Sequence, residues 1–311
     1  MKMLTIRALG DRTHGIGASE IAAVLGLHPT RTPVDVWLEK TGRTTYNGRL
    51  LDAGEPVAAS GAATPVVVKE APEMAWGRIL EPAIVDWYAR TMRVVFDPEF
   101  DGTRAARDPE FPNVWASPDR VAVAPRRTVE GKSVGWQMAY KWGSPGTDAV
   151  PVEYWLQVQL QTRCIGTTED AHVVAAIAGR PPEVWVVPFD GMLARDLAER
   201  AQAWFDYYVD GGHEPPPHRP EDAAKLVRAL MRKSMPRVAE VTPRLREAVE
   251  AVHDARSVRD EAEGLVSFHE SRVKRIMGDC DSARDTDFSI TWRTSASGSR
   301  PFRLTFKGDK E

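Results

Sequence analysis

The chain has 311 residues, of which 42% are hydrophobic and 27% are charged, and its formal net charge at pH 7 is −3. This composition predicts a globular protein with one substantial core plus an appendage. It excludes a membrane-spanning helix, because no apolar run approaches about 18 residues. The two cysteines, Cys164 and Cys280, exclude a disulfide framework and a Cys-rich metal module. The first residues contain too short an apolar core for a signal peptide, so we expect a reducing cytoplasm.

The first part of the chain is predicted to be mainly helical. A helix is expected to begin at Ser19, a good N-cap, and to end at Gly26. A second helix begins near Thr32-Pro33, since proline suits a first turn, and it buries Val36, Trp37 and Leu38. Residues 44–73 are rich in Gly, Ala, Pro and Val without a clear period. They are interpreted as a long surface insertion with a short strand at 66–68.

The central part combines helices and strands. A helix is predicted over 77–88, with Pro82 near its start or at a bend. The next elements are strands at 93–97, 113–123 and 127–134, a helix at 151–165, strands at 171–178 and 183–189, and a helix at 190–210 ending at Gly211-Gly212. This order predicts an α/β fold, in which ligand sites lie at strand ends.

The last part is predicted to be a separate arm. The proline-rich tract 214–220 is interpreted as an extended connector and a domain boundary. Beyond it, 221–231 and 241–278 are helical and charged, and the alternating runs 287–293 and 301–306 predict a β-hairpin. A long charged helix cannot bury a core alone, so we expect the arm to dock on the first domain, a neighbouring subunit or a partner. The spacing of Leu245, Val249 and Val252 favours docking over an exposed tail.

The most informative motif combines Asp119, which follows Ser117-Pro118, with the triplet Glu130-Gly131-Lys132. Alternation along a strand places Glu130 and Lys132 on one face and Gly131 on the other. Two carboxylates and an ammonium at a strand end would form a magnesium site suited to phosphodiester hydrolysis. Taken alone, the motif also fits an exposed strand with a Glu–Lys pair.

This motif consists of two segments, Ala116-Ser117-Pro118-Asp119 and Glu130-Gly131-Lys132, and three further motifs surround them in the chain. They are the glycine segment Gly15-Ile16-Gly17-Ala18-Ser19-Glu20-Ile21-Ala22, Gly77-Arg78-Ile79-Leu80-Glu81-Pro82 and Tyr154-Trp155-Leu156-Gln157-Val158-Gln159. Over residues 10–210 the chain thereby resembles the YqaJ-type viral recombinase family, relatives of lambda phage exonuclease among the PD-(D/E)xK nucleases. The resemblance implies a restriction-endonuclease-like core with a central mixed sheet flanked by helices, followed here by a helical arm and a β-hairpin.

The resemblance also implies roles for single residues. Asp119, Glu130 and the Gly131 carbonyl would bind Mg²⁺, with Mn²⁺ as a substitute, and Glu81 would complete the site through water. Lys132 would orient or deprotonate the attacking water, and Gln157 would lie on a helix over the site. Two assignments have a structural alternative: Glu81 as a helix-start carboxylate, and Gln157 with Gln161 as a polar surface stripe.

Arg12, Ser19 and Ser117 lie where lambda-type exonucleases contact the terminal 5′ phosphate. Arg7 and Arg31 are close in sequence to Arg12 and are alternatives to it. The net charge of −3 is unusual for a DNA enzyme, because phosphate contacts supply much of the binding free energy. Gly131 is smaller than the apolar residue often found at its position in the family, and the insertion 44–73 is long.

The resemblance therefore implies a phage Mg²⁺-dependent exonuclease that degrades double-stranded DNA 5′ to 3′ and leaves 3′ single-stranded overhangs for recombination by strand annealing. Residues 1–212 would form the nuclease domain and 221–311 the arm with its hairpin. Implied partners are double-stranded DNA ends, a phage single-strand annealing protein and two further copies in a homotrimer, in the host bacterial cytoplasm. The alternatives are an endonuclease of the same superfamily and a non-catalytic DNA-binding accessory protein.

Overall fold

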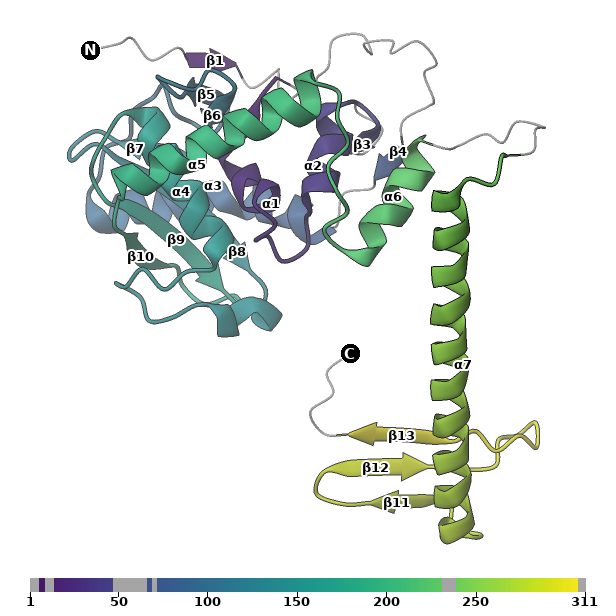
Figure 1. The fold of residues 1–311 in the computed structure, drawn as a ribbon. Helices are drawn as coiled ribbons and strands as arrows, with labels where there is room; N and C mark the ends of the chain where they lie inside the picture. The colour runs from purple at the N-terminus through teal and green to yellow at the C-terminus, as the bar shows by residue number, and fades with distance from the viewer. Residues whose placement is uncertain (1–5, 9–13, 47–65, 69–71, 231–238, 307–311) are drawn as a thin grey trace. The chain divides into compact units, whose positions relative to one another are not determined.

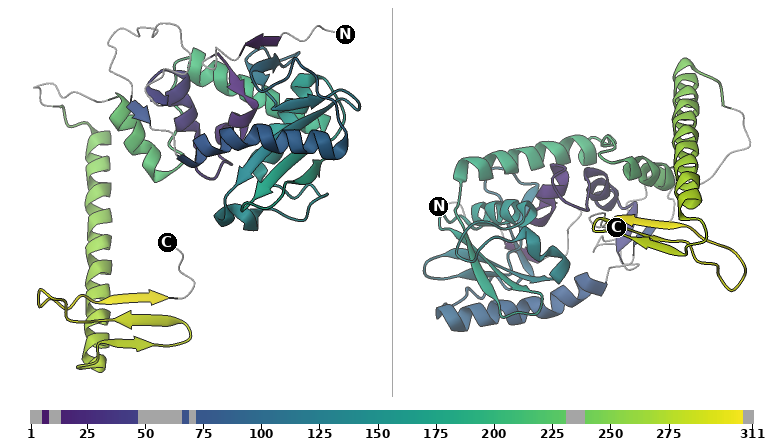
Figure 2. Two further views of the ribbon diagram at one scale, coloured as in Figure 1. Left: turned by 180° about the vertical axis from the view of Figure 1, so that it is seen from behind. Right: turned by 90° about the horizontal axis from the view of Figure 1, so that it is seen from below.

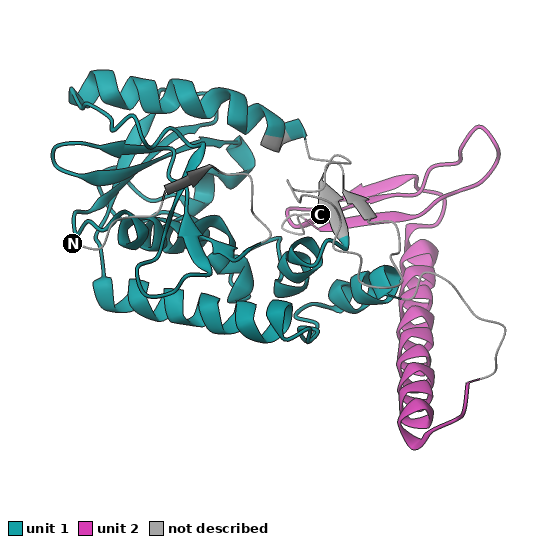
Figure 3. Cartoon of the chain, turned by 90° about the horizontal axis from the view of Figure 1, so that it is seen from above, with its two compact units in different colours: residues 1–234 teal, residues 235–311 magenta. Residues whose placement is uncertain are grey.

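The structure is a computed structural model that describes residues 6–8, 14–46, 66–68, 72–230 and 239–306. The expected contact of Arg12 lies outside these residues, as does most of the predicted insertion 44–73. The chain forms two compact units, Met1–Ser234 and Met235–Glu311 (Figure 3). No helix in the described ranges is long and apolar enough to cross a membrane.

Unit 1 is a mixed α/β structure (Figure 1). In place of one central sheet, its described residues form two four-stranded sheets and a parallel pair. The first sheet has the order β1 (Ile6–Ala8), β5 (Arg104–Arg107), β6 (Val114–Ala116), β2 (Ile16–Gly17). The second has the order β10 (Glu183–Val187), β9 (Ala171–Ile177), β8 (Arg127–Val134), β7 (Arg120–Ala122). The pair is β3 (Thr44–Tyr46) with β4 (Val66–Val68), so the predicted strand at 66–68 is present. Both larger sheets are mixed, because β2–β6 and β8–β9 are parallel and their other pairs antiparallel.

The single strand expected over 113–123 is wrong, because β6 and β7 belong to different sheets. The break falls at Ser117-Pro118. The Ser117 hydroxyl donates to the backbone carbonyls of Gly102 and Arg104, and Pro118 has no N–H for a ladder. Asp119 therefore lies at the corner between the two sheets. The strand expected at 93–97 is reduced to one isolated bridge, between Phe96 and Ala122.

Two helices enclose the second sheet (Figures 1 and 2). Helix α3 (Pro72–Met92) packs Ile84, Val85 and Tyr88 against Val129 and Val174. Helix α4 (Val152–Ile165) packs Val158 against Ala171, Val173 and Ala175, which share one face of β9. The α3 helix begins five residues earlier than predicted, so Pro82 lies inside it rather than at its start. Helix α5 (Gly191–Trp204), which continues as the π-helical turn Phe205–Asp210, packs on α4.

The N-terminal segment differs from expectation in one detail. Ser19 is not an N-cap: it lies within the 3-10 turn Ala18–Glu20 (η1), whose cap is Gly17, and the Glu20 carboxylate accepts from Gly17 N at 2.8 Å. Helix α1 (Ile21–Val24) follows, and Gly26 adopts a positive φ of 72° as expected at a helix end. Helix α2 (Pro33–Lys40) begins as predicted, with Thr32 as its N-cap.

Helix α6 (Pro220–Leu230) belongs to unit 1, whereas the sequence placed it in the arm. Asp222 explains this placement: it is fully buried and accepts from Thr32 Oγ1 at 2.8 Å and from the backbone N–H groups of His218 and Arg219. Leu226 and Ala229 then complete a core cluster with Val34, Trp37 and Leu38 of α2.

Unit 2 consists of helix α7 (Pro243–Met277) and a three-stranded antiparallel sheet, β11 (Ser282–Arg284), β12 (Phe288–Thr291) and β13 (Arg303–Phe306). The predicted hairpin is the β12–β13 pair. The sequence missed β11, which is three residues long and carries no apolar alternation. Ile290 is buried in this unit, and Lys274 of α7 lies 4.7 Å from the centroid of the Phe302 ring. No residue of α7 is buried.

Candidate active site

The carboxylate of Asp119 is held at the start of the β7–β8 hairpin. Its Oδ2 accepts a hydrogen bond of 2.7 Å from the backbone N–H of Gly131. This contact is possible because β7 and β8 pair antiparallel, with Arg120 opposite Val129, so the residue before β7 reaches the middle of β8. The structure thus brings Asp119 to the Glu130-Gly131-Lys132 triplet, as the sequence predicts.

Glu130 and Lys132 lie on the face of β8 that α4 covers. Lys132 Nζ contacts Glu130 Oε1 at 2.5 Å and lies 5.1 Å from the centroid of the Tyr154 ring. Gln157 Nε2 donates to the same Oε1 at 2.6 Å, so α4 places this amide over the carboxylate. The exposed-strand alternative is therefore wrong, because Glu130 is buried.

The sequence missed the role of Gln161, although it lies one helical turn after Gln157. Its Nε2 donates to Glu130 Oε2 at 2.7 Å. Gln157 and Gln161 are only 7% and 1% exposed, so they are not a polar surface stripe. Their i, i+4 spacing was the available signal, because it places both amides on one face of the helix.

Gly131 faces α3, opposite to Glu130 and Lys132. A Cβ atom built there would lie 3.0 Å from Val85 Cγ1 and 3.4 Å from the Glu81 carbonyl oxygen. The glycine thereby permits α3 to approach β8 closely, which brings the half-buried Glu81 into the electrostatic field of Glu130 and Lys132. The larger apolar side chain often found at this position in the family would not fit this spacing.

Burial and neighbouring charges shift the pKa values of the ionisable groups in this site. Burial, and next the charge of Glu130, raise the pKa of Asp119 from 3.8 to about 7. Burial likewise raises the pKa of Glu81. Although burial opposes it, the charges of Glu130 and Asp119 raise the pKa of Lys132 above its usual range, so this ammonium keeps its proton. Three carboxyl groups, Glu81, Asp119 and Glu130, therefore face the single ammonium of Lys132.

This donor set fits a hard divalent cation in its chemistry. Carboxylate and backbone carbonyl oxygens are the ligands of Mg²⁺, which keeps several waters rather than taking a complete protein cage. Among the described residues, no three His, Cys, Asp or Glu side chains are arranged to hold a metal ion by themselves. The residues that would hold Mg²⁺ are Asp119, Glu130 and the carbonyl of Gly131. Burial first and the charge of Glu130 second raise the pKa of Asp119, and a bound cation would oppose both effects.

Two of the three residues predicted to contact a 5′ phosphate lie in the described residues. Ser19 is exposed on η1, which packs against β6 and α4. Ser117 directly follows β6, and its hydroxyl donates to two backbone carbonyls. The two hydroxyls therefore lie on neighbouring elements.

A second buried ionic cluster lies between η1 and α2, and the sequence gave no indication of it. Glu20 Oε2 contacts Lys40 Nζ at 2.7 Å, Glu20 Oε1 contacts Arg31 at 3.2 Å, and Arg31 also pairs with Glu39. Lys40 Nζ lies 5.8 Å from the centroid of the Trp115 ring. Glu20, Glu39 and Lys40 are all buried.

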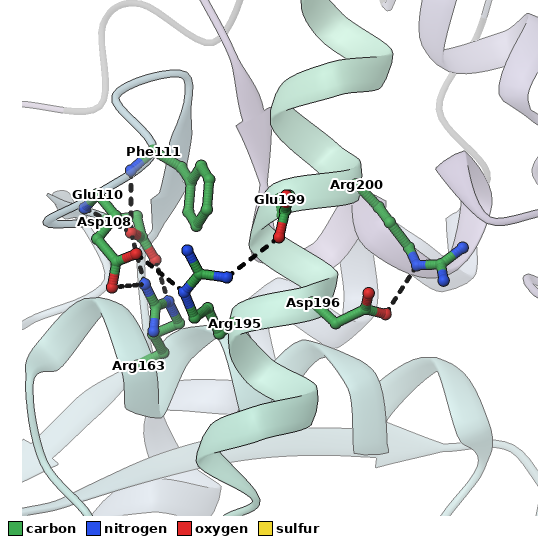
Figure 4. Close-up of polar contacts among 8 residues, drawn as sticks. All are labelled: Asp108, Glu110, Phe111, Arg163, Arg195, Asp196, Glu199 and Arg200. Atoms are coloured by element: carbon green, nitrogen blue, oxygen red, sulfur yellow. Dashed lines mark hydrogen bonds and ion pairs between the residues drawn. The ribbon is translucent and has the colours of Figure 1, made fainter.

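A third network joins the end of α4 to the loop before β6 (Figure 4). Arg163 contacts both Asp108, at 2.5 Å, and Glu110, at 3.0 Å, and Glu110 also accepts from Arg195 of α5 at 3.0 Å. By tying this loop to α4, the network stabilises the path of the chain that leads through β6 to Asp119.

Comparison with known proteins decides the family. The model of the YqaJ-like viral recombinase domain matches residues 9–169, slightly more than half of the chain. The chain belongs to the YqaJ-like viral recombinase family. The resemblance seen in the sequence motifs is thereby confirmed.

The YqaJ-like chain is 24% identical over 208 residues to the uncharacterized protein YqaJ of Bacillus subtilis (strain 168). This match covers 66% of the present chain and 56% of that protein, so it spans little more than half the length of the curated relative.

Two solved proteins have a similar structure. One is an alkaline exonuclease (LHK-Exo) from Laribacter hongkongensis, with 19% identity, coverage of 70% of this chain and 97% of that one, and a TM-score of 0.48. The same enzyme in complex with dAMP gives a TM-score of 0.49. The other is a phage-related exonuclease from Haemophilus somnus 129PT, with 11% identity, coverage of 64% and 96%, and a TM-score of 0.40.

Proposed function

We propose that this YqaJ-like protein is a phage Mg²⁺-dependent deoxyribonuclease that hydrolyses double-stranded DNA 5′ to 3′ and leaves 3′ single-stranded overhangs for recombination by strand annealing. The observation that carries the proposal is the cluster of Asp119, the buried Glu130 and Lys132 at the β7–β8 hairpin. A β-hairpin that carries these residues between two flanking helices supports a PD-(D/E)xK nuclease core. Membership in a viral recombinase family supports the biological role.

Bound Mg²⁺ would supply positive charge that activates water and stabilises the developing phosphate charge. Asp119, Glu130 and the Gly131 carbonyl are the residues that would hold it, and Glu81 would contribute through water. The raised pKa of Lys132 keeps its ammonium protonated, so it would orient the attacking water by donating to it rather than remove its proton. Gln157 holds the Glu130 carboxylate in place through Oε1.

Arg12, Ser19 and Ser117 are proposed to bind the terminal 5′ phosphate, since charge-assisted hydrogen bonds from an arginine and hydroxyls recognise phosphate oxygens. For Ser117 this requires the hydroxyl hydrogen to turn away from the carbonyls that now accept it. Digestion of 5′-phosphorylated ends should outpace digestion of 5′-hydroxyl ends, and Arg12→Ala should remove much of that difference. Equal wild-type rates on both ends would refute this pocket.

One assay tests the proposed function against its alternatives. End-labelled linear duplex, with a 5′ phosphate or 5′ hydroxyl, is incubated beside a closed circle in Mg²⁺, Mn²⁺ or EDTA. An exonuclease degrades the linear duplex and spares the circle, and it requires the divalent cation. Cutting of the circle would show an endonuclease, and DNA binding without hydrolysis would show an accessory protein.

The proposed partners are double-stranded DNA ends and a phage single-strand annealing protein in the host bacterial cytoplasm, which would receive the 3′ overhang. A ring-shaped homotrimer would keep the enzyme on its substrate by topology. Light scattering of the purified full-length protein measures the number of copies, and a monomer at assay concentrations would rule out the ring.

A further inference from the structure

Three glutamines alternate along α4, and all three are buried: Gln157, Gln159 and Gln161. Gln157 and Gln161, four residues apart, share one face and both donate to Glu130. Gln159 points elsewhere. Its Nε2 donates to the Pro188 carbonyl at 2.7 Å and its Oε1 accepts from Asp190 N at 2.9 Å, which anchors the chain before α5. Glutamine side chains of one helix therefore make two different kinds of contact, one with Glu130 and one with the backbone before α5.

The two oxygens of Glu130 have different partners. Oε1 accepts from both Lys132 Nζ and Gln157 Nε2, whereas Oε2 accepts from Gln161 Nε2 among the described residues. A carboxylate oxygen has two lone-pair sites. The two hydrogen bonds to Oε1 therefore occupy its sites, and one site of Oε2 is left for a further ligand.

Gln161 keeps this contact at a cost to its own hydrogen bonding. Its Oε1 is buried and has no hydrogen-bond partner among the described residues. A buried unpaired carbonyl oxygen destabilises a fold. Gln159, on the same helix and equally buried, has both its amide oxygen and its nitrogen paired. The unpaired oxygen indicates that the Gln161 amide is retained for its N–H contact with Glu130 rather than for packing.

We propose that Gln161 is a positioning residue of the metal site, which fixes Glu130 so that Oε2 is the oxygen available to a divalent cation. This inference deepens the proposed function and rests on it, because it concerns the same metal site. Outer partners that orient a ligating carboxylate typically change metal affinity by about 10- to 100-fold when they are removed. Gln161 acts on Glu130 and is not expected to touch the DNA.

The test measures Mn²⁺ binding to the full-length protein by calorimetry, without DNA and without a cleavage readout. Gln161→Met keeps the length of the side chain and removes the N–H donor, and it should weaken Mn²⁺ binding by about tenfold or more. The matched control is Gln159→Met, the same exchange on the same helix, which should bind Mn²⁺ as tightly as the wild type even where its melting temperature falls. Gln161→His, which can present an N–H at a similar distance, should recover most of the affinity.

Equal Mn²⁺ affinity in wild type and folded Gln161→Met would overturn the inference, as would an equal loss in Gln159→Met. Should Gln161→Met fail to fold, Gln161→Asn replaces it: this variant keeps an amide but withdraws it by one methylene, and wild-type affinity there would overturn the inference equally. A wild-type protein that binds no Mn²⁺ would refute both the inference and the proposed metal dependence. A wild-type protein that binds Mn²⁺ but leaves DNA intact would refute the nuclease alone.

Discussion

Two ionic clusters of unit 1 consist of the same residue types but differ in how their charges are neutralised. The balanced cluster, Glu20, Arg31, Glu39 and Lys40, pairs two carboxylates with two cations. In the anionic cluster, Glu81, Asp119 and Glu130 share one half-buried ammonium, Lys132, and the exposed Arg78 acts on Glu81. The number of cations that face the carboxylates distinguishes the two clusters more clearly than burial does.

The pKa values of Glu20 and Asp119 differ in this way, although burial raises the pKa of Glu39 within the balanced cluster. Although burial opposes it, Lys40 and Arg31 lower the pKa of Glu20. At Asp119, burial and the charge of Glu130 outweigh Lys132, and they raise the pKa to about 7. In the balanced cluster each carboxylate has a cation within contact distance. An excess of negative charge away from water is costly unless protons or cations neutralise it, which supports the proposed metal site.

The largest expected effect is on catalysis. Asp119→Asn should lower DNA cleavage by about three orders of magnitude or more, because losing an anionic ligand removes the ion that stabilises the transition state. Glu20→Gln, the same chemical exchange in the balanced cluster, should leave kcat within a few-fold of wild type below its melting temperature. Initial rates on linear duplex measure both. Substantial cleavage by purified Asp119→Asn would refute the assignment of the anionic cluster as a metal site.

Lys132→Met should lower kcat by roughly 10²-fold, the order expected when a group that orients a reactant is lost. Metal binding and DNA binding should persist, because the carboxylates remain. The measurement combines single-turnover cleavage with calorimetric Mn²⁺ binding and a DNA-binding assay in Ca²⁺. If the variant lost Mn²⁺ binding together with cleavage, Lys132 would be a structural partner of Glu130 and not a catalytic group.

The balanced cluster should determine stability instead. Glu20→Gln leaves Lys40 buried without its carboxylate, and breaking a buried pair in this way costs about 3 to 5 kcal/mol. Urea denaturation of the metal-free protein measures this loss in the free energy of unfolding. Asp119→Asn in the same assay at pH 8 should be neutral or stabilising, since it removes excess negative charge. A large destabilisation in Asp119→Asn would break the distinction between the two clusters.

The raised pKa of Asp119 predicts a dependence of stability on pH. A carboxyl group with a folded pKa of about 7 and an unfolded value near 3.8 binds its proton more tightly in the folded state. Its contribution to stability is therefore present below pH 4 and is lost as the pH rises through about 7. Melting temperatures in EDTA should show this loss in wild type and not in Asp119→Asn, and Mg²⁺ should restore stability mainly at the higher pH. If the melting temperatures of wild type and Asp119→Asn in EDTA depended on pH in the same way, the raised pKa of Asp119 would be contradicted.

The smallest effect on both clusters should come from removing the arm. Truncation after Leu230 should leave metal binding and the melting temperature of unit 1 unchanged, but alter oligomeric state, solubility or processivity. Truncation after Gly212 also removes α6 and uncovers Val34 and Trp37, which should cost roughly 3 kcal/mol of stability, in the range of a lost core side chain. Light scattering, thermal melts and single-round digestion would compare the two truncated proteins with the full-length protein. If the protein truncated after Leu230 kept the oligomeric mass per subunit and the processivity of the full-length protein, the arm would serve neither assembly nor processive digestion.

Local patterns in the sequence were sufficient for much of the fold. The proline at the start of α2, the spacing of α4 and α5, and the β-branched runs of β9 and β10 each depend on neighbouring residues in the chain, and the structure confirms them. The same reasoning placed Glu130 and Lys132 on one face of β8, because alternation along a strand is also a local property.

Helices α6 and α7 show where this reasoning fails. Both are charged and amphipathic in sequence, and both were assigned to the arm. Helix α6 packs within unit 1, because Asp222 meets Thr32 Oγ1 and two N–H groups at the N-terminus of the helix. Whether a charged helix docks depends on partners that lie about 190 positions away in the chain, and its own composition does not reveal them.

The sequence by itself determined the family, the α-helices, the residue types of the anionic cluster and the strands β4, β8, β9, β10, β12 and β13. Only the tertiary structure decided that residues 113–123 divide between two sheets, that Asp119 meets Gly131 N, that Gln161 holds the second oxygen of Glu130, and that Glu20 is neutralised by Lys40. The physical reason is that helix and strand formation is largely local, whereas the state of a buried polar group depends on which donors and charges distant elements bring to it.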